Sequence, residues 1–396
     1  MTETWMLAAL WMGLALVATI ASVVLRVATA LSEIVVGIIA QLVIGAIVGT
    51  AFLGADQSWV KFVAGTGAIL LTFLAGAELD PEVFRRKWKE AVTIGLVSFF
   101  APFLVCAAAA HWLLGWDARA SWLAGIAMST TSVAVVYAVM LEFGFNVTDY
   151  GKTVLAACFI TDLGTVLALA LVFAPFTLKT GVFVTVSALA IAVLPWLTPI
   201  FFKRFGGRPS ELEAKYLLFC LFVLGALATW ADSEAVLPAY VLGMILAGTV
   251  GKDHMLVRRL RTLTFGLLTP FYFIRAGSFV SVPALIVAPA AFLLMLVTKM
   301  LAKFAGVYPI AAAYGSPHRE AMYTTLLMST GLTFGTIASL FGISHGIIDQ
   351  AQYSALVAAV IASAVVPTLI ANAFFMPHHL RRPIAASEAS EATKAK

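Results

Sequence analysis

Long apolar runs, separated by short polar segments, fill almost the whole of this chain and constrain its fold more than any motif does. Runs of about 17–25 residues can cross the hydrocarbon core of a bilayer as helices. Of the 396 residues, 62% are hydrophobic and 11% are charged, whereas roughly 25% are charged in an average soluble domain. The sequence therefore predicts an all-α polytopic membrane protein.

The runs predict thirteen transmembrane helices. Their expected spans are 4–25, 32–54, 59–79, 91–115, 120–142, 152–175, 181–202, 214–231, 235–250, 263–280, 284–312, 320–343 and 350–375. The first is expected to be retained, because MTETWM has no basic segment and no small-residue cleavage site.

Basic residues divide unevenly between the two sides that thirteen helices define. Nineteen of the 25 Lys and Arg fall on one side, and Lys61, Arg119 and Lys179 fall on the other. The positive-inside rule then places the N-terminus outside and the C-terminus in the cytoplasm, in the inner cell membrane. The net charge of +5 comes from loops that face anionic headgroups, so the lipid bilayer is the expected partner and nucleic acid is not.

Asp162 lies in the middle of an otherwise uncharged stretch, residues 153–177, that is long enough to span a bilayer. Its depth is ~15 Å, near the centre of a ~30 Å hydrocarbon core. A charged residue there costs about 2.5–3.5 kcal/mol on insertion and is typical of ion and proton pathways. The alternative is a carboxylate paired with a basic neighbour for structural reasons alone.

Two predicted helices, 120–142 and 320–343, are interrupted at mid-depth by hydroxyl and glycine residues. Such paired interruptions are typical of transporter binding sites, whereas the alternative is that the hydroxyls bond to their own helices or to a neighbouring helix. The first set is Ser129, Thr130, Thr131 and Ser132, and the second is Ser329, Thr330, Gly331, Thr333, Gly335 and Thr336.

The two interrupted helices enter the membrane from opposite sides, which predicts an inverted repeat of helices 1–6 and 8–13. The remaining charges at mid-depth are Lys299 and Lys303, on one face of the run 284–312. Either could be the charge partner of Asp162, and depth favours Lys303.

Arg275, in the run 263–280, is expected to snorkel or to have a structural partner, with tuning of the ion pathway as the alternative.

Several segments resemble the monovalent cation:proton antiporter family 2, above all its NapA-like and GerN-like sodium(potassium)/proton antiporters. The resemblance covers nearly the whole chain. The segments are FLAGAELDPEVFRR (Phe73–Arg86), STTSVAVVYAVMLEFG (Ser129–Gly144), ITDLG (Ile160–Gly164), KFAG (Lys303–Gly306) and STGLTFGTIA (Ser329–Ala338).

The resemblance implies a homodimer with a sodium/proton antiporter-like fold, in which two discontinuous helices cross beside the ion-binding Asp. It assigns that role to Asp162 and the lysine role to Lys303, and makes the two interrupted segments the unwound crossing. The implied dimerisation domain comprises residues 1–90 and 211–281, and the transport domain comprises 91–177 and 282–377. Residues 178–210 form a linker helix, and 378–396 form a short cytoplasmic tail.

One departure concerns the residue before Asp162. It is usually Asp, Asn or Gln in the family, whereas here it is Thr161, which offers a hydroxyl oxygen to a cation but no charge. The second carboxylate that pairs with the lysine in a two-proton electrogenic cycle is therefore missing. The simplest cycle then exchanges one proton for one cation, and the rival is that Lys303 releases a second proton.

These features favour a secondary antiporter that exchanges Na⁺ or K⁺ for protons by alternating access, with both ligands competing for Asp162. The alternatives are a sodium-coupled symporter of an organic anion and a cation channel. The polar residues concentrate at two breaks and one carboxylate, whereas a channel needs a continuous polar pore. We expect no enzymatic activity and no cofactor, because the sequence has no HExxH motif or nucleophile–base arrangement.

Overall fold

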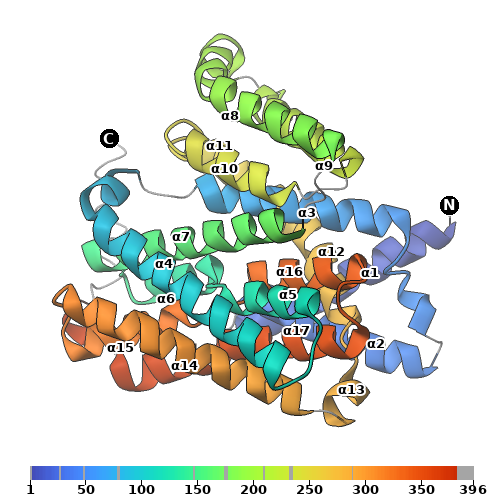
Figure 1. The fold of residues 1–396 in the computed structure, drawn as a ribbon. Helices are drawn as coiled ribbons and strands as arrows, with labels where there is room; N and C mark the ends of the chain where they lie inside the picture. Colours follow the sequence, from blue (N-terminus) through green and yellow to red (C-terminus); the bar gives the residue numbers. More distant parts are fainter. Residues whose placement is uncertain are drawn as a thin grey trace. The chain divides into compact units, whose positions relative to one another are not determined.

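The computed structural model describes residues 2–25, 28–47, 50–77, 81–145, 148–173, 177–207, 210–231, 235–287 and 289–380. The predicted tail therefore lies outside the described residues from 381 onwards. Within these ranges the regular structure is helical, with no strand, and the chain divides into two compact units. The predicted all-α class is confirmed (Figure 1).

Unit 1 comprises residues 1–81 and 166–279. Its helices are α1 (Thr2–Leu25), α2 (Thr29–Ile47), η1 (Thr50–Leu53), α3 (Ser58–Ala77), α8 (Leu178–Phe205), α9 (Leu212–Trp230), α10 (Val236–Leu246), α11 (His254–Leu263), η2 (Thr264–Leu268) and α12 (Thr269–Ser278).

Unit 2 comprises residues 82–165 and 280–396. Its helices are α4 (Pro81–Trp112), α5 (Ala118–Ser129), α6 (Val133–Glu142), α13 (Val282–Val287), α14 (Pro289–Ala313), α15 (His318–Met328), α16 (Thr333–Ser344), α17 (Gln350–Ile370), η3 (Ala371–Phe375) and η4 (His378–Leu380). The helix α7 (Asp149–Phe173) contributes its residues up to Thr165 to this unit and the remainder to unit 1.

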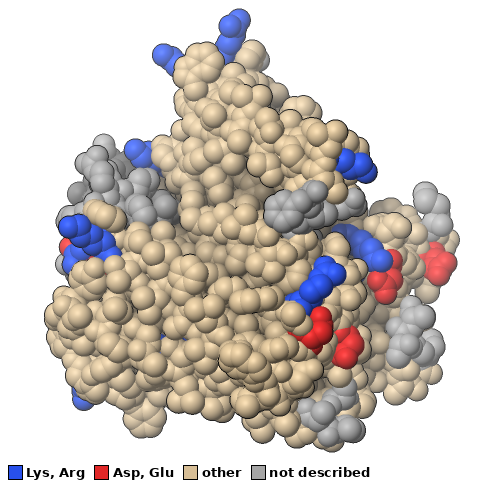
Figure 2. All heavy atoms as spheres, in the orientation of Figure 1, with Lys and Arg blue, Asp and Glu red and all other residues tan. Residues whose placement is uncertain are grey.

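Among the described residues, ten helices are long and apolar enough to cross a membrane. The other three predicted spans hold shorter helices, namely α5 with α6, α10, and η2 with α12. Figure 2 shows a face on which uncharged atoms dominate and charged side chains are few, as a surface in contact with lipid requires. The chain is a multi-pass membrane protein.

Helix ends differ from the predicted spans where hydropathy is a poor guide. The helix α4 begins at Pro81, ten residues before the predicted start, because it continues through charged residues with a kink at Lys87. The predicted span 284–312 contains two helices, α13 and α14, and Pro289 begins the second, as proline favours a first helical position. Outside the predicted spans, α11 is a short amphipathic helix with a basic exposed face.

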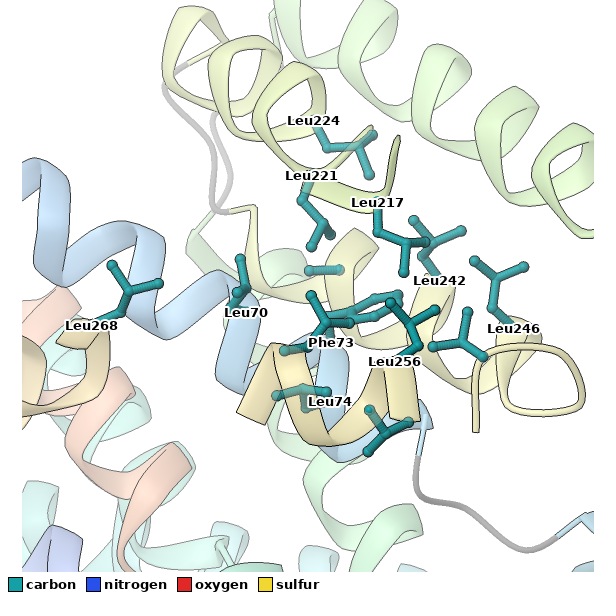
Figure 3. Close-up of a cluster of buried hydrophobic side chains, with 14 residues drawn as sticks. Leu70, Phe73, Leu74, Leu217, Leu221, Leu224, Leu242, Leu246, Leu256 and Leu268 are labelled. Atoms are coloured by element: carbon teal, nitrogen blue, oxygen red, sulfur yellow. The ribbon is translucent and has the colours of Figure 1, made fainter. Parts of the chain in front are cut away.

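A leucine-rich cluster fills the interior of unit 1, where α3, α9, α10 and α11 pack together (Figure 3). Each helix contributes side chains at helical spacing, for example Leu217, Leu221 and Leu224 of α9. The backbones of α3 and α10 approach closely, because Gly76 lies against the carbonyl of Tyr240 and Gly243 lies against that of Phe73. Small residues at such contacts permit close packing of membrane helices.

Arg275 of α12 fixes the segment that follows α2. Its Nε donates to the carbonyl of Ala55 at 2.8 Å, and a terminal guanidinium nitrogen lies 3.7 Å from Oδ1 of Asp56. Trp11 of α1 holds the same segment by donating to the carbonyl of Leu53 at 2.8 Å. Arg275 thus has the structural partners that one of the two alternatives predicted.

Unit 2 repeats one order of elements. A long helix (α4 or α14) is followed by two half-helices (α5 and α6, or α15 and α16) and then by another long helix (α7 or α17). In the second series, α14 lies beside α15 and α17 (Figure 1). A capping box between Asp349 and Gln352 begins α17, which satisfies backbone donors that a helix start leaves unpaired.

Candidate functional site

The two predicted interruptions are breaks in the helices of unit 2. The helix α5 ends at Ser129, Thr130 has an extended conformation (φ −62°, ψ 153°), and α6 begins at Val133. The helix α15 ends at Met328, and α16 begins at Thr333 after Leu332 (φ −144°, ψ −71°). Each break is about one helical turn long.

The second break is shorter than the segment predicted to be unwound. Thr333, Gly335 and Thr336 lie in the first turn of α16, where the amide of Thr336 already bonds to the carbonyl of Leu332 at 2.9 Å. Gly335 allows α16 to approach α5, because a Cβ there would lie 3.0 Å from the carbonyl oxygen of Ala127. Gly335 is therefore helical in the structure and lies close to its neighbours.

The two breaks hold each other through hydrogen bonds. The amide of Ser132 donates to the carbonyl of Thr330 at 3.2 Å, and Oγ1 of Thr131 donates to the carbonyl of Met328 at 2.9 Å. Backbone groups that the breaks leave without a partner in their own helix therefore bond to the other broken helix. Backbone groups inside a bilayer need such partners, because no water is available to bond to them.

Most hydroxyls at the breaks bond to their own helices, as the alternative reading of these residues predicted. The hydroxyl of Thr131 bonds instead to Met328 at the end of the neighbouring helix α15, which the same alternative allowed. The hydroxyls that bond to their own helix are those of Ser129, Thr130, Ser329, Thr330 and Thr336.

Asp162 lies on the face of α7 that meets both breaks. Cys158 and Thr165, at positions i−4 and i+3, share this face. The Sγ of Cys158 lies 3.6 Å from Sδ of Met328, at the end of α15. The Oγ1 of Thr165 lies 3.4 Å from Oγ of Ser129, at the end of α5. Asp162 thus lies between residues that contact the ends of both half-helices.

The Asp162 carboxyl group is buried with an unsatisfied oxygen. The residue is 1% exposed, and its Oδ1 has no hydrogen-bond partner. Leaving a buried polar atom unpaired costs about 1–3 kcal/mol, and more for a charged group. An oxygen in this state is a strong acceptor for a proton or a desolvated cation.

Lys303 of α14 is fully buried and bonds to the first break. Its Nζ donates to Oγ of Ser98 at 2.7 Å, to the carbonyl of Ser129 at 2.9 Å and to Oγ1 of Thr131 at 3.1 Å. The charges of Lys303 and Asp162 interact electrostatically, but the three hydrogen bonds of the ammonium go elsewhere. The lysine is therefore a neighbouring charge of Asp162 rather than its hydrogen-bond partner.

Lys299, one turn earlier on α14, is equally buried and lies at the second break. Its Nζ donates to Oγ of Ser363 on α17 at 3.0 Å, and it lies against Gly331. The structure thus brings both predicted lysines to the breaks, one to each.

Thr161 faces α4. Its hydroxyl lies 3.1 Å from the carbonyl oxygens of both Gly95 and Ala157, which share its one hydrogen. The donated atom is the hydroxyl hydrogen, so the oxygen retains lone pairs that can accept a ligand.

Three site residues escaped the sequence analysis, namely Ser98, Thr165 and Ser363. Each is a buried hydroxyl in an apolar run, and their partners lie far away in the sequence. Ser98 lies in α4, the counterpart of α14 in the predicted repeat, and that correspondence is the signal that points to it. Among the described residues, no group of three or more His, Cys, Asp and Glu side chains could hold a metal ion.

Comparison with known proteins identifies residues 12–376 with the family described as sodium/hydrogen exchanger, transmembrane. The chain is 26% identical over 352 residues to the probable Na(+)/H(+) antiporter 3 of Methanocaldococcus jannaschii, covering 85% of this chain and 89% of the relative. It is 26% identical over 355 residues to the glutathione-regulated potassium-efflux system protein KefC of Enterobacter sp., covering 84% and 56%. Cation/H(+) antiporter 18 of Arabidopsis thaliana is longer still, and the chain spans 46% of it.

The structure of the sodium proton antiporter MjNhaP1 from Methanocaldococcus jannaschii superposes with a TM-score of 0.66 at 12% identity. The superposition covers 96% of this chain and 98% of that one, and it establishes the antiporter-like fold. The predicted resemblance to monovalent cation:proton antiporters is confirmed. The family match spans most of the chain, and the chain belongs to the transmembrane sodium/hydrogen exchanger family.

Proposed function

We propose that this protein is a secondary antiporter that exchanges Na⁺ or K⁺ for protons across the membrane at Asp162. Its family is that of sodium/hydrogen exchangers, and the relatives above are named as a Na(+)/H(+) antiporter and a potassium-efflux protein. The observation that carries the proposal is the unpartnered Oδ1 of Asp162, buried on the α7 face that meets both breaks.

Exchange follows from the cost of burying charge. A carboxylate with a bound proton or a bound monovalent cation is neutral, whereas the bare carboxylate is not. Moving an uncompensated charge through an apolar barrier is expensive. Alternating access by the two loaded states alone therefore couples the two fluxes. Asp162 supplies the anionic oxygen, and hydroxyl and carbonyl oxygens at the breaks, with Thr161, complete the cation site.

The geometry of Lys303 favours a one-for-one cycle. Its three acceptors match the three N–H donors of an ammonium group. These contacts hold the Lys303 side chain in place, so Asp162 serves as the single group that exchanges ligands in this cycle. One proton then moves against one monovalent cation, and transport is electroneutral.

The remaining assignments extend the same proposal. Residues 91–177 and 282–377 form the transport domain, and residues 1–90 and 211–281 form the dimerisation domain of a homodimer. The N-terminus lies outside and the C-terminus in the cytoplasm, in the inner cell membrane. The bias of basic residues supports this orientation.

Reconstituted Asp162→Asn tests the proposal. In proteoliposomes with a pH-sensitive dye, Na⁺ or K⁺ pulses should move protons with the native protein and not with this variant. Asp349→Asn is the matched control, because Asp349 is exposed and Asn caps a helix equally well. Native exchange by Asp162→Asn would refute the proposal. Cation flux without proton movement in the native protein would indicate a channel or a symporter instead.

A further inference from the structure

Lys299 is a second buried lysine in a site where the proposed exchange uses only one. It is 0% exposed, and its Nζ donates to Oγ of Ser363 at 3.0 Å. The same Ser363 oxygen contacts the carbonyl of Val360 at 2.9 Å and that of Gly331 at 3.4 Å. A side chain at position 331 would overlap the Lys299 ammonium group. Glycine at the second break therefore makes room for this lysine.

Each of the two lysines lies at one of the breaks. Lys303 binds the carbonyl of Ser129, the last residue of α5. The C-terminal end of a helix carries unpaired carbonyls and a partial negative charge, which a cation stabilises. Lys299 lies against Gly331, three residues after the last residue of α15. Each break thus has its own lysine, but only Lys303 bonds to the carbonyl that ends a half-helix.

The second break is connected to the carboxylate only indirectly. Thr330, beside Gly331, accepts the amide of Ser132 in the first break. Met328, at the end of α15, contacts Cys158 on the Asp162 face of α7. Lys303 interacts electrostatically both with Asp162 and with Lys299.

We propose that Lys299 is a positioning residue for transport: together with Ser363, whose hydroxyl contacts the Gly331 carbonyl, its amino group holds the segment after α15 in the broken geometry. It does not bind the transported cation. This inference rests on the proposed antiport at Asp162. It gives the two lysines different functions, because Lys303 acts on the charge of Asp162 and Lys299 acts on the shape of the second break.

The kinetic test uses Lys299→Met, Ser363→Ala and the double variant in proteoliposomes. We expect the maximal exchange rate to fall about 10-fold or more in each, a typical effect of removing a group that orients a binding site. The apparent cation KM should keep its native dependence on pH. The double variant should be no slower than Lys299→Met, because both changes break one interaction. Lys299→Arg should recover part of the rate.

Ser339→Ala is the matched control, because Ser339 is equally buried and bonds only to the carbonyl of Gly335 in its own helix. It should exchange at the native rate. A shift in the pH dependence of KM in Lys299→Met, similar to that of Lys303→Met, would overturn the proposal. Additive rate losses in the double variant would also overturn it.

A structural measurement tests the inference without transport. In hydrogen–deuterium exchange, the amides of residues 329–333 should exchange faster in Lys299→Met than in the native protein. The amides of residues 150–160 should exchange at the native rate. Unchanged exchange at 329–333 would contradict the role of Lys299 even if antiport at Asp162 holds. If the native protein showed no antiport at Asp162, the proposed function would be contradicted. The hydrogen–deuterium exchange result would still be valid as a test of the contact made by Lys299.

Discussion

Lys303 carries its charge into the interior of unit 2 with one acceptor for each N–H of an ammonium group. Asp162 has the opposite arrangement, because its Oδ1 has no donor. Removing the partners of a buried charge is costly, whereas an unpartnered buried oxygen can gain a partner when a ligand binds. We therefore propose a structural role for Lys303 and an exchanging role for Asp162.

Replacing Lys303 by Met should lower stability. The change leaves the oxygens of Ser98, Ser129 and Thr131 without their donor, and a hydrogen bond to a charged group contributes about 1.5–3 kcal/mol. We expect a clear drop in melting temperature, measured by intrinsic fluorescence in detergent. Lys215→Met is the control, because Lys215 is exposed on α9. Equal melting temperatures for the two variants would contradict the assigned bonds.

Depth in an apolar run pointed to Asp162, Lys299 and Lys303 as buried ionisable residues, and all three are buried in the structure. The same logic could not find Ser98 or Ser363. A serine in a helix can bond to its own backbone, so its presence in an apolar run carries little information. Its actual partner depends on which helices meet, and this required the structure.

Contacts between helices in unit 1 depend on glycine. A Cβ on Gly76 would overlap the carbonyl of Tyr240 and lie 2.8 Å from the amide of Met244. These are backbone atoms of α10, which cannot move away as a side chain can. Gly65, in the same helix α3, has no neighbouring atom within 4 Å of that position.

Gly76→Ala should therefore destabilise the protein by about 1–3 kcal/mol, as overpacking does. Gly65→Ala should be neutral or slightly stabilising, because alanine favours a helix by about 0.5–1 kcal/mol over glycine. The melting temperatures of the two purified variants measure the difference. A Gly76→Ala variant as stable as Gly65→Ala would show that α3 and α10 are not in close contact.

Hydropathy predicted which segments form helices better than where each helix begins, ends or breaks. It placed the breaks near Ser129 and Ser329 from their hydroxyl and glycine content, but extended the second through Thr336, because helical threonine and unwound threonine look alike in sequence. It also missed α11, whose basic exposed face and buried Leu256 and Leu260 form an amphipathic rather than an apolar pattern.

At the scale of the whole molecule, the charge carried per cycle follows from how many groups release a proton. If Asp162 alone does, no net charge crosses the membrane. A cation jump on a solid-supported membrane should then give little current, with or without a protonophore. Sustained currents that disappear in Lys303→Gln would contradict this, because they would show that Lys303 releases a second proton when the cation binds.

Competition between a proton and a cation for Asp162 is the central claim, and the pH dependence of the apparent cation KM in proteoliposomes tests it most directly. Below the pKa of the site, protons occupy the carboxyl group, and the cation has to displace them. The apparent KM should therefore rise about tenfold for each unit that the pH falls, while the maximal rate stays nearly constant. An apparent KM that does not change with pH in this range would place the two ligands at separate sites.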